Sequence, residues 1–271
     1  MIKIGCNYLS FKGAEISVED FIQTCHELRL DCVDFHQRAF ASQETDYLLG
    51  MKRQCLDLGL PVGYLGMGGG FAGDEEFQRS KVAEAKVVID MALVLGAPLI
   101  RVFGWSATDD EDREPLFGAL ARCLHEVCDY GAERGVVVAL QNHNNRNLAA
   151  TGPDVLRIRE EVDHANFSLV VDTGQWRGAH GAFGDMDPNV DIYAYIEQTL
   201  PFASYVRCKI YQIASGREEI LDYARIGRLL RAVDYNGCIS IVYEGDDEED
   251  RPVSIAKAAA HLRDVFTGES S

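Results

Sequence analysis

The stretches Val136-Val-Val-Ala-Leu-Gln-Asn-His143 and Phe167-Ser-Leu-Val-Val-Asp-Thr-Gly174 are short apolar runs that each end in polar residues. Runs of this length that are rich in valine are typical of strands buried on both faces of a parallel sheet. The ligand clefts of such sheets open at the carboxyl ends of the strands. The two stretches therefore predict a buried parallel sheet with its chemistry near Gln141 and Asp172.

The same pattern recurs along the whole chain and alternates with helical periodicity. Strands are predicted at residues 2–7, 32–36, 62–67, 99–105, 136–143, 167–173, 205–210 and 238–244. Helices are predicted at residues 18–30, 45–58, 77–95, 114–134, 153–162, 192–200, 223–233 and 253–266. Several helices should end beside a glycine in the left-handed conformation, namely Gly59, Gly96, Gly135 and Gly237. Eight alternations favour a (β/α)8 TIM barrel over an open doubly wound sheet, so we expect one α/β domain over residues 1–271.

The composition fits one globular domain and narrows the choice of partners. The chain has 271 residues, of which 47% are hydrophobic and 25% charged, and 43 acidic against 26 basic residues give a net charge of -17. Because no block rich in lysine and arginine occurs, nucleic-acid binding is disfavoured. No apolar run approaches the roughly 18 residues of a membrane span. The eight cysteines lack paired short spacings, so we expect reduced thiols in a cytoplasmic protein.

Three loop segments can be interpreted in more than one way. The run Gly66-Met-Gly-Gly-Gly70 follows the third predicted strand, and we interpret it as a flexible loop rather than a phosphate cradle because no helix start follows it directly. The glycine-rich segment 178–184 is either a mobile lid or a plain connection. The acidic run 246–250 is interpreted as a solvated turn that begins the last helix, since acidic residues are favourable at a helix N-terminus. If it faces the pocket instead, it disfavours highly anionic substrates.

The strand ends can be read by parity, because strand side chains alternate between the two faces of a sheet. One face then carries the following chemistry-bearing side chains: His36, Arg101, Trp105, Gln141, His143, Asp172, Arg207, Lys209 and Glu244. Polar groups from six strands should therefore meet at one mouth of the barrel, where enzymes of this fold hold their active sites.

Four strand ends also carry a resemblance to a known family. Leu140-Gln-Asn-His143, Val171-Asp-Thr-Gly174, Tyr205-Val-Arg-Cys-Lys209 and Ser240-Ile-Val-Tyr-Glu-Gly245, in this order, resemble the xylose isomerase-like barrel superfamily. That superfamily includes sugar-phosphate isomerases and epimerases, inosose dehydratase and endonuclease IV. The resemblance implies a small carbohydrate substrate and a divalent metal, such as manganese, magnesium, cobalt or zinc. It also implies the metal ligands: glutamate on strand five, aspartate on strand six, histidine on strand seven and glutamate on strand eight.

The chain departs from this ligand set at three of the four positions. Gln141, Arg207 and Val242 replace the strand-five glutamate, the strand-seven histidine and the strand-eight glutamate, and Asp172 alone stays in register. Glutamine still offers a neutral oxygen, but arginine has no lone pair to donate and carries a permanent positive charge that repels a cation.

Two interpretations of the altered site stay open. One is a rebuilt metal site of Asp172 and Glu244 with Gln141 or His143. The other is that Arg207 and Lys209 perform the electrostatic role of the metal, because a fixed cation in a dry pocket favours developing negative charge.

The leading hypothesis is an isomerase, epimerase or lyase that moves a proton next to a carbonyl of a sugar, keto-sugar or polyol derivative. Asp172 and Glu244 are assigned as acid/base or ligand groups, Lys209 as electrophilic support and His143 as a proton carrier. Substrate contacts are assigned to a further set: Gln141, Asn142, Arg207, Arg101, His36, Trp105 and Trp176.

Structural alternatives stand beside these roles. Asp172 and Lys209 can form a simple salt bridge, His36 can be a core histidine partnered by Asp34, and aromatic residues fill barrel rims for packing alone. In a different class of function, the chain is a non-catalytic carbohydrate-binding or partner-binding barrel that has lost its reaction. An endonuclease-like activity is disfavoured by the acidic composition, and a homo-oligomer is compatible with the resemblance.

Overall fold

The computed structural model describes residues 2–14, 16–108, 111–144, 146–181, 186–245 and 249–267. Its strands are β1 (Lys3–Asn7), β2 (Val33–His36), β3 (Val62–Gly66), β4 (Leu99–Phe103), β5 (Val137–Gln141), β6 (Phe167–Asp172), β7 (Ala203–Ile210) and β8 (Cys238–Tyr243). All pair in parallel and in sequence order, and β1 closes the barrel against β8. The predicted (β/α)8 fold is therefore confirmed.

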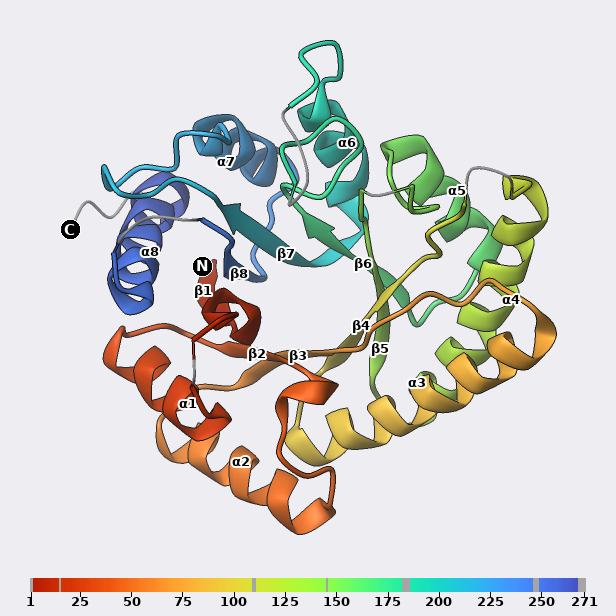
Figure 1. Cartoon of the computed structure of the whole chain (residues 1–271), viewed down its shortest axis with the longest axis horizontal. Coiled ribbons are helices and arrows are strands. Elements are labelled where there is room, and N and C mark those ends of the chain that lie inside the picture. Colours follow the sequence, from red (N-terminus) through yellow and green to blue (C-terminus); the bar gives the residue numbers. More distant parts are fainter. Residues whose placement is uncertain are drawn as a thin grey trace.

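The helices surround the barrel as an outer layer (Figure 1). They are α1 (Val18–Glu27), α2 (Thr45–Asp57), α3 (Glu75–Leu95), α4 (Arg113–Ala132), α5 (Gly152–Val162), α6 (Ile192–Thr199), α7 (Tyr223–Ala232) and α8 (Arg251–Thr267). Short 3-10 turns lie at Tyr8–Phe11 (η1), Gln37–Ala39 (η2) and Leu200–Phe202 (η3). Side-chain oxygens cap the N-termini of six of the helices, at Ser17, Asp74, Asp112, Thr151, Asp191 and Asp222.

Glycines follow three of the helices in the predicted left-handed conformation. Gly59, Gly96 and Gly135 have φ angles of 70°, 81° and 67°. The prediction for Gly237 is wrong, because α7 already ends at Ala232 and Asp234 adopts the left-handed conformation, with a φ of 51°. Aspartate tolerates that conformation better than most residues do, since its short polar side chain can bond locally.

The lower half of the barrel interior is filled by apolar and aromatic side chains. Tyr64, Leu99, Ala139, Val170 and Tyr205 form this inner cluster, separate from the larger core between the sheet and the helices. Because strand side chains alternate, the next inward positions on these strands lie two residues further on, at the carboxyl end. The packed cluster thus closes the bottom of the barrel and leaves the mouth to polar residues.

The loop segments at the mouth are described in part. The loop after β3 is packed tightly, with Met67 and Phe71 fully buried. In the segment predicted as a lid, residues 182–184 lie outside the described residues, and so do residues 246–248 of the acidic run. Among the described residues, no helix is both long and apolar enough to cross a membrane.

Candidate active site

Neighbouring strands place the predicted polar side chains together at the carboxyl mouth of the barrel. Gln141 on β5, Asp172 on β6 and Arg207 on β7 each follow a member of the inner cluster by two residues. Asp172 lies opposite Arg207 in the parallel register of β6 and β7. Strand alternation and the closed bottom of the barrel therefore account for this part of the site.

Asp172 is enclosed by hydrogen-bond donors. Its Oδ2 accepts from Gln141 Nε2 at 3.0 Å and lies 3.2 Å from Arg207 Nη1 and 4.0 Å from Lys209 Nζ. Its Oδ1 accepts from the Gly174 N–H at 3.1 Å, and Arg207 Nη1 also donates to Gln141 Oε1 at 2.6 Å. The carboxylate is fully buried, which is tolerable only because it is paired and hydrogen-bonded.

Asn142 fixes the end of β6 and does not face the mouth. Its Oδ1 accepts from the Asp172 backbone N–H at 2.7 Å, and its Nδ2 donates to the backbone carbonyls of Asp172 and Gln175, each at 2.9 Å. Both ends of the amide are thus occupied by backbone groups in a buried position. Its position is at odds with the predicted substrate contact and makes Asn142 a residue that positions Asp172.

Lys209 and Glu244 form an ion pair between the buried network and solvent. The Lys209 side chain is 2% exposed, whereas that of Glu244 is 30% exposed. Burial favours the neutral form of Glu244, but the charge and hydrogen bond of Lys209 outweigh burial and hold the pKa of Glu244 below its ordinary value. Burial also lowers the pKa of Lys209, although the charges of Asp172 and Glu244 oppose it. Glu244 is therefore an accessible carboxylate backed by a buried cation.

Two cavities lie at the mouth. The larger, of about 350 Å³, is lined by His180, Tyr211, Gln212, Ala214, Glu219, Glu244 and Gly245. The smaller, of about 270 Å³, is lined by Gly69, Gly70, Phe77, Phe103, Gly104, Trp105, Ser106, His143 and Asn147. The predicted residues Glu244, His143 and Trp105 thus border open space, Glu244 in one cavity and the other two in the second.

His143 presents a neutral imidazole to the smaller cavity. Its ring packs edge-on against Phe103, with ring centroids 5.1 Å apart, and its Nδ1 lies 3.2 Å from the Asn144 carbonyl oxygen. That contact places the proton on Nδ1 and leaves a lone pair on Nε2. Burial lowers the pKa of His143, and the charge of Lys209 also lowers it. Charge on His143 in turn acts on the pKa of Glu244, so the two groups influence one another across the mouth.

Arg101 and His36 form the β2–β4 side of the mouth. The Arg101 guanidinium lies 4.2 Å from the Phe103 ring centroid, and its Nη1 donates to the Met67 carbonyl at 3.0 Å. Gly66 gives it room, because a Cβ there would lie 2.5 Å from Arg101 Nη2. Burial lowers the pKa of His36 to about 4, and the charge of Arg101 contributes, so this imidazole is neutral at pH 7.

Trp176 lies apart from the other predicted site residues. It is fully buried, and its ring contacts Tyr195 of α6, with centroids 5.7 Å apart. The chain turns outward after β6, so this side chain packs in the outer layer. Its position is at odds with the predicted substrate contact, whereas Trp105 borders the smaller cavity.

A polar contact that involves none of the predicted site residues lies one layer below the mouth. The Tyr205 hydroxyl donates to Asp34 Oδ1 at 2.7 Å, so Asp34 pairs with Tyr205 and not with His36. Parity places Tyr205 on the inward face of β7, but it does not reveal that Asp34 is the partner of its hydroxyl. His180 and Tyr211, whose ring centroids are 4.7 Å apart, line the larger cavity. Both lie in loops, where periodicity gives no signal.

The residues at the mouth do not fit the metal that the resemblance implies. Arg207 takes the place of a ligand, and its guanidinium lies against Asp172, the one ligand retained. The Lys209 ammonium contacts the carboxylates of both Asp172 and Glu244, which a rebuilt metal site would have to share. Because two fixed cations repel a third, this donor set matches protein cations better than a metal ion.

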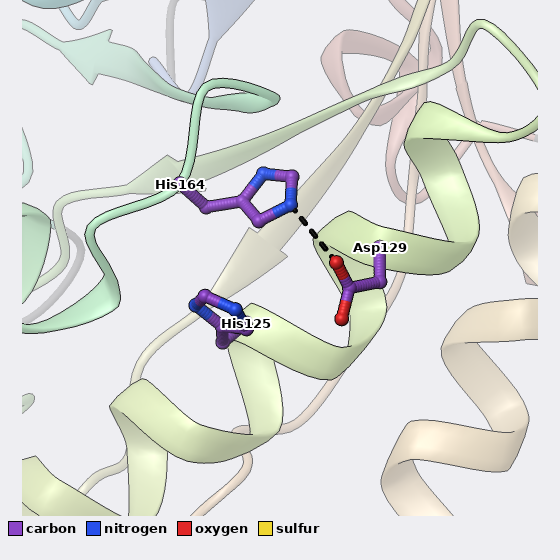
Figure 2. Close-up of side chains that lie close together, drawn as sticks. All are labelled: His125, Asp129 and His164. Carbon is purple, nitrogen blue, oxygen red and sulfur yellow. Dashed lines mark hydrogen bonds and ion pairs between the residues drawn. The ribbon is translucent and has the colours of Figure 1, made fainter.

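A second cluster, His125, Asp129 and His164, lies where α4 meets the turn before β6 (Figure 2). His164 Nδ1 accepts from the Asn166 N–H at 2.9 Å, and its Nε2 lies 3.1 Å from Asp129 Oδ1. The proton of His164 is therefore on Nε2, which leaves that nitrogen no lone pair for a metal. His125 Nδ1 lies 2.8 Å from the Val162 carbonyl at the end of α5. Through these hydrogen bonds the cluster connects α4 to the end of α5.

Both the sequence and the fold of this chain are similar to those of known proteins. A sequence profile of the family described as xylose isomerase-like TIM barrel matches residues 22–265. No protein of curated function matches the sequence significantly.

Several solved structures share the fold over nearly the whole chain. D-psicose 3-epimerase from Clostridium cellulolyticum H10, solved with D-tagatose, has a TM-score of 0.81 at 16% identity, covering 98% of this chain and 99% of that chain. L-ribulose 3-epimerase has a TM-score of 0.78 at 19% identity, covering 99% and 94%. An AP endonuclease, family 2, from Brucella melitensis has a TM-score of 0.76 at 16% identity, covering 96% and 98%. At these identities the likeness establishes the fold alone.

Proposed function

The chain belongs to the xylose isomerase-like TIM barrel family, and from this premise we propose that it is a sugar isomerase-like or epimerase-like enzyme. It moves a proton next to a carbonyl group of a sugar, keto-sugar or polyol derivative. Structural neighbours that act as sugar 3-epimerases support this substrate class. The observation that carries the proposal is Glu244, a partly exposed carboxylate at the edge of a cavity, held by the buried Lys209 ammonium.

The first step is a proton abstraction by Glu244. A substrate carbonyl oxygen that approaches Lys209 Nζ takes the place of the Glu244 carboxylate as acceptor. Glu244 then loses the contact that depresses its pKa and becomes a stronger base. It removes a proton from the carbon next to the carbonyl, and the electron pair moves onto the carbonyl oxygen.

The cations of the site stabilise the enolate that forms. Lys209 lies at the developing oxyanion, and Arg207 is held behind it by Asp172 and Gln141. Fixed charges in a buried site are effective because they need no reorganisation during the reaction. Return of a proton to the opposite face of the same carbon gives epimerisation. Return of a proton to the neighbouring carbon gives isomerisation. Loss of a hydroxyl group from the enolate gives elimination, the reaction of a lyase. His143 is the group placed to deliver the returning proton: its Nε2 takes up a proton from water and gives it to the carbon, while Glu244 releases the proton that it removed to water.

Solvent exchange tests this assignment. The protein is incubated with D-psicose, D-tagatose and L-ribulose in deuterated water, and loss of carbon-bound proton signals is followed by NMR. Glu244→Gln should slow exchange by at least about 100-fold, the contribution typical of a positioned base. The control is Glu249→Gln, because Glu249 also pairs with a lysine, Lys257 at 2.5 Å, but does not line either mouth cavity. Equal rates in the two variants would overturn the role of Glu244.

A second candidate is a non-catalytic carbohydrate-binding or partner-binding barrel. It is favoured by the enclosure of Asp172, whose two carboxylate oxygens are engaged by Gln141, Arg207 and Gly174. The same sugars would then raise the melting temperature of the protein without any exchange at carbon. That combination would replace the enzymatic proposal by the binding one.

A further inference from the structure

Arg101 is a buried cation that lacks a carboxylate partner among the described residues. The residue is 1% exposed, and its Nε has no hydrogen-bond partner in the described part of the chain. Its other contacts are the Met67 carbonyl and the rings of Phe103 and Tyr64. A buried charge is costly unless an opposite charge accompanies it. The carboxylates of the mouth do not serve Arg101 directly, since Asp172 contacts Arg207 and Glu244 contacts Lys209.

Among the residues that the structure describes, the neighbouring titratable side chains do not supply Arg101 with a counter-ion. The neighbouring His36 is kept neutral by burial and by the charges of Arg101 and Arg38. On the other side of the glycine loop, Lys81 Nζ lies 3.5 Å from the Gly68 carbonyl and would lie 2.9 Å from a Cβ at Gly69. Glu84 pairs with Lys81 at 2.6 Å, and Arg38 is exposed to solvent, so Arg101 is the buried cation of this corner that stays without a counter-ion in the described structure.

A cavity adjoins this corner of the mouth. The smaller cavity is bordered by Gly69 and Gly70 of the glycine loop and by Phe103, the ring on which Arg101 stacks. Gly70 packs directly on the Gly104 carbonyl, where no Cβ would fit, so the loop brings backbone rather than side chains to the cavity wall. The larger cavity has the opposite character, because Glu219 and Glu244 line it.

We propose that the substrate of this site carries an anionic group, a carboxylate or a phosphate ester, which lies in the cavity beside the glycine loop with Arg101 as its counter-ion. The inference rests on the proposed function, because the anchored anionic group would orient the reacting carbonyl of the substrate toward Lys209 and Glu244. The negative charge then lies at the glycine loop, away from the acidic cavity. Arg101 lies behind Phe103, which borders the cavity, so its charge acts on the anion at short range through this low-dielectric wall.

Anion fragments test this site without knowledge of the whole substrate. Trp105 lines the smaller cavity, while the chain's other tryptophan, Trp176, is fully buried elsewhere. Tryptophan fluorescence is therefore followed during titration with sodium acetate and, separately, with inorganic phosphate, at constant ionic strength. The same titrations use Arg101→Met and the control Arg159→Met, since Arg159 also stacks on a phenylalanine, Phe202 at 4.0 Å.

The expected result is a saturable change in the wild type and in Arg159→Met, with the apparent affinity at least about tenfold weaker in Arg101→Met. Saturation by acetate alone identifies a carboxylate, and saturation by phosphate alone identifies a phosphate ester. A change that does not saturate with either anion, or one that persists at full affinity in Arg101→Met, overturns the inference. If Arg101→Met does not fold, as judged by circular dichroism, Arg101→Gln takes its place, and its affinity should fall because the positive charge is lost while polar contacts of the side chain can be kept.

The inference and the proposed function fail separately. Saturable, Arg101-dependent anion binding without proton exchange on the neutral ketoses, on their phosphate esters or on keto-sugar acids would leave the anion site standing and remove the enzymatic proposal. Proton exchange on neutral ketoses without saturable anion binding would support the enzymatic proposal and overturn the anion site.

Discussion

Arg207 and Asp172 form a buried ion pair in which guanidinium Nη1 lies 3.2 Å from carboxylate Oδ2. Burial by itself would lower the pKa of Arg207, but nearby negative groups, including Asp172 and Glu244, raise it above its ordinary value. Gln141 binds both partners and closes the network. Each ion is thus tolerated in the barrel because the other is present, and this mutual dependence governs the behaviour of the whole mouth.

Removal of the negative partner should destabilise the fold. Asp172→Asn leaves Arg207 and Lys209 as buried cations without their shared carboxylate, and we expect the free energy of unfolding to fall by about 3–5 kcal/mol. Urea denaturation measures it. Asp191→Asn is the control, because the pair of Asp191 with Arg225 is exposed and should be worth at most about 1 kcal/mol. The double variant Asp172→Asn/Arg207→Met should lose less than the sum of the single variants, and additive losses would contradict coupling between the two ions.

The wild type should not bind a stoichiometric metal ion, and a variant with the family's ligand set should bind one. After incubation with manganese, cobalt or zinc and removal of unbound ion, elemental analysis should find less than one equivalent per chain. The variant Gln141→Glu/Arg207→His/Val242→Glu removes the guanidinium and restores the ligand types, so it should retain about one equivalent. The assignment of Arg207 and Lys209 would be contradicted if the wild type bound a stoichiometric metal ion and a chelator removed both the metal and the proton-exchange activity.

The pH dependence of proton exchange follows from the pKa shifts at the mouth. The pKa of His143 is lowered from 6.5 and that of Glu244 from 4.5, so the acid limb should have its midpoint below pH 6.5. Burial lowers the pKa of Lys209 from 10.5, so the alkaline limb should lie below pH 10.5. Lys209→Arg should move the alkaline limb upward, because a guanidinium stays charged. An acid midpoint above pH 6.5 would exclude His143 and Glu244 as the titrating groups.

Stability should depend on pH through Asp34. Burial raises its pKa from 3.8 to about 7, although the hydrogen bond from Tyr205 opposes the shift. The folded state therefore holds the proton more tightly than the unfolded state. This contribution is fully present below pH 3.8 and is lost as pH rises through about 7. The shift corresponds to on the order of 4 kcal/mol at most.

Asp34→Asn should remove this pH dependence. Urea denaturation at pH 4 and pH 8 measures the difference for the wild type and the variant. The wild type should lose more stability between the two values than the variant does. Parallel losses would show that Asp34 does not titrate in this range.

Most of the fold is contained in local sequence patterns. Valine-rich runs of five to eight residues mark both-face burial, and caps such as Ser17 and Asp74 fix the helix starts, so both element types are predicted to within a few residues. Alternation along the strands then places Gln141, Asp172 and Arg207 on one mouth. The error at Gly237 arises because the turn after α7 uses Asp234 for a conformation that glycine usually supplies.

The remaining features of the site depend on contacts between distant segments. Asn142 directly follows Gln141, so strand alternation turns its side chain away from the mouth, whereas Trp176 lies four residues beyond the end of β6, where alternation gives no signal. The contact of Asp34 with Tyr205 joins β2 to β7 across the barrel, which no spacing in the sequence reveals. The isolation of Arg101 depends likewise on which carboxylates lie nearby in space.

The close approach of Arg101 to Gly66 restricts how the two positions can change during evolution. Because the guanidinium of Arg101 occupies the volume that a side chain at position 66 would need, the two positions cannot vary independently. Related chains that keep arginine at the position of Arg101 should keep glycine at the position of Gly66, and chains with a larger residue there should carry a shorter one on β4. This pair of positions is thus a covariation marker by which members with the same mouth can be recognised in sequence collections.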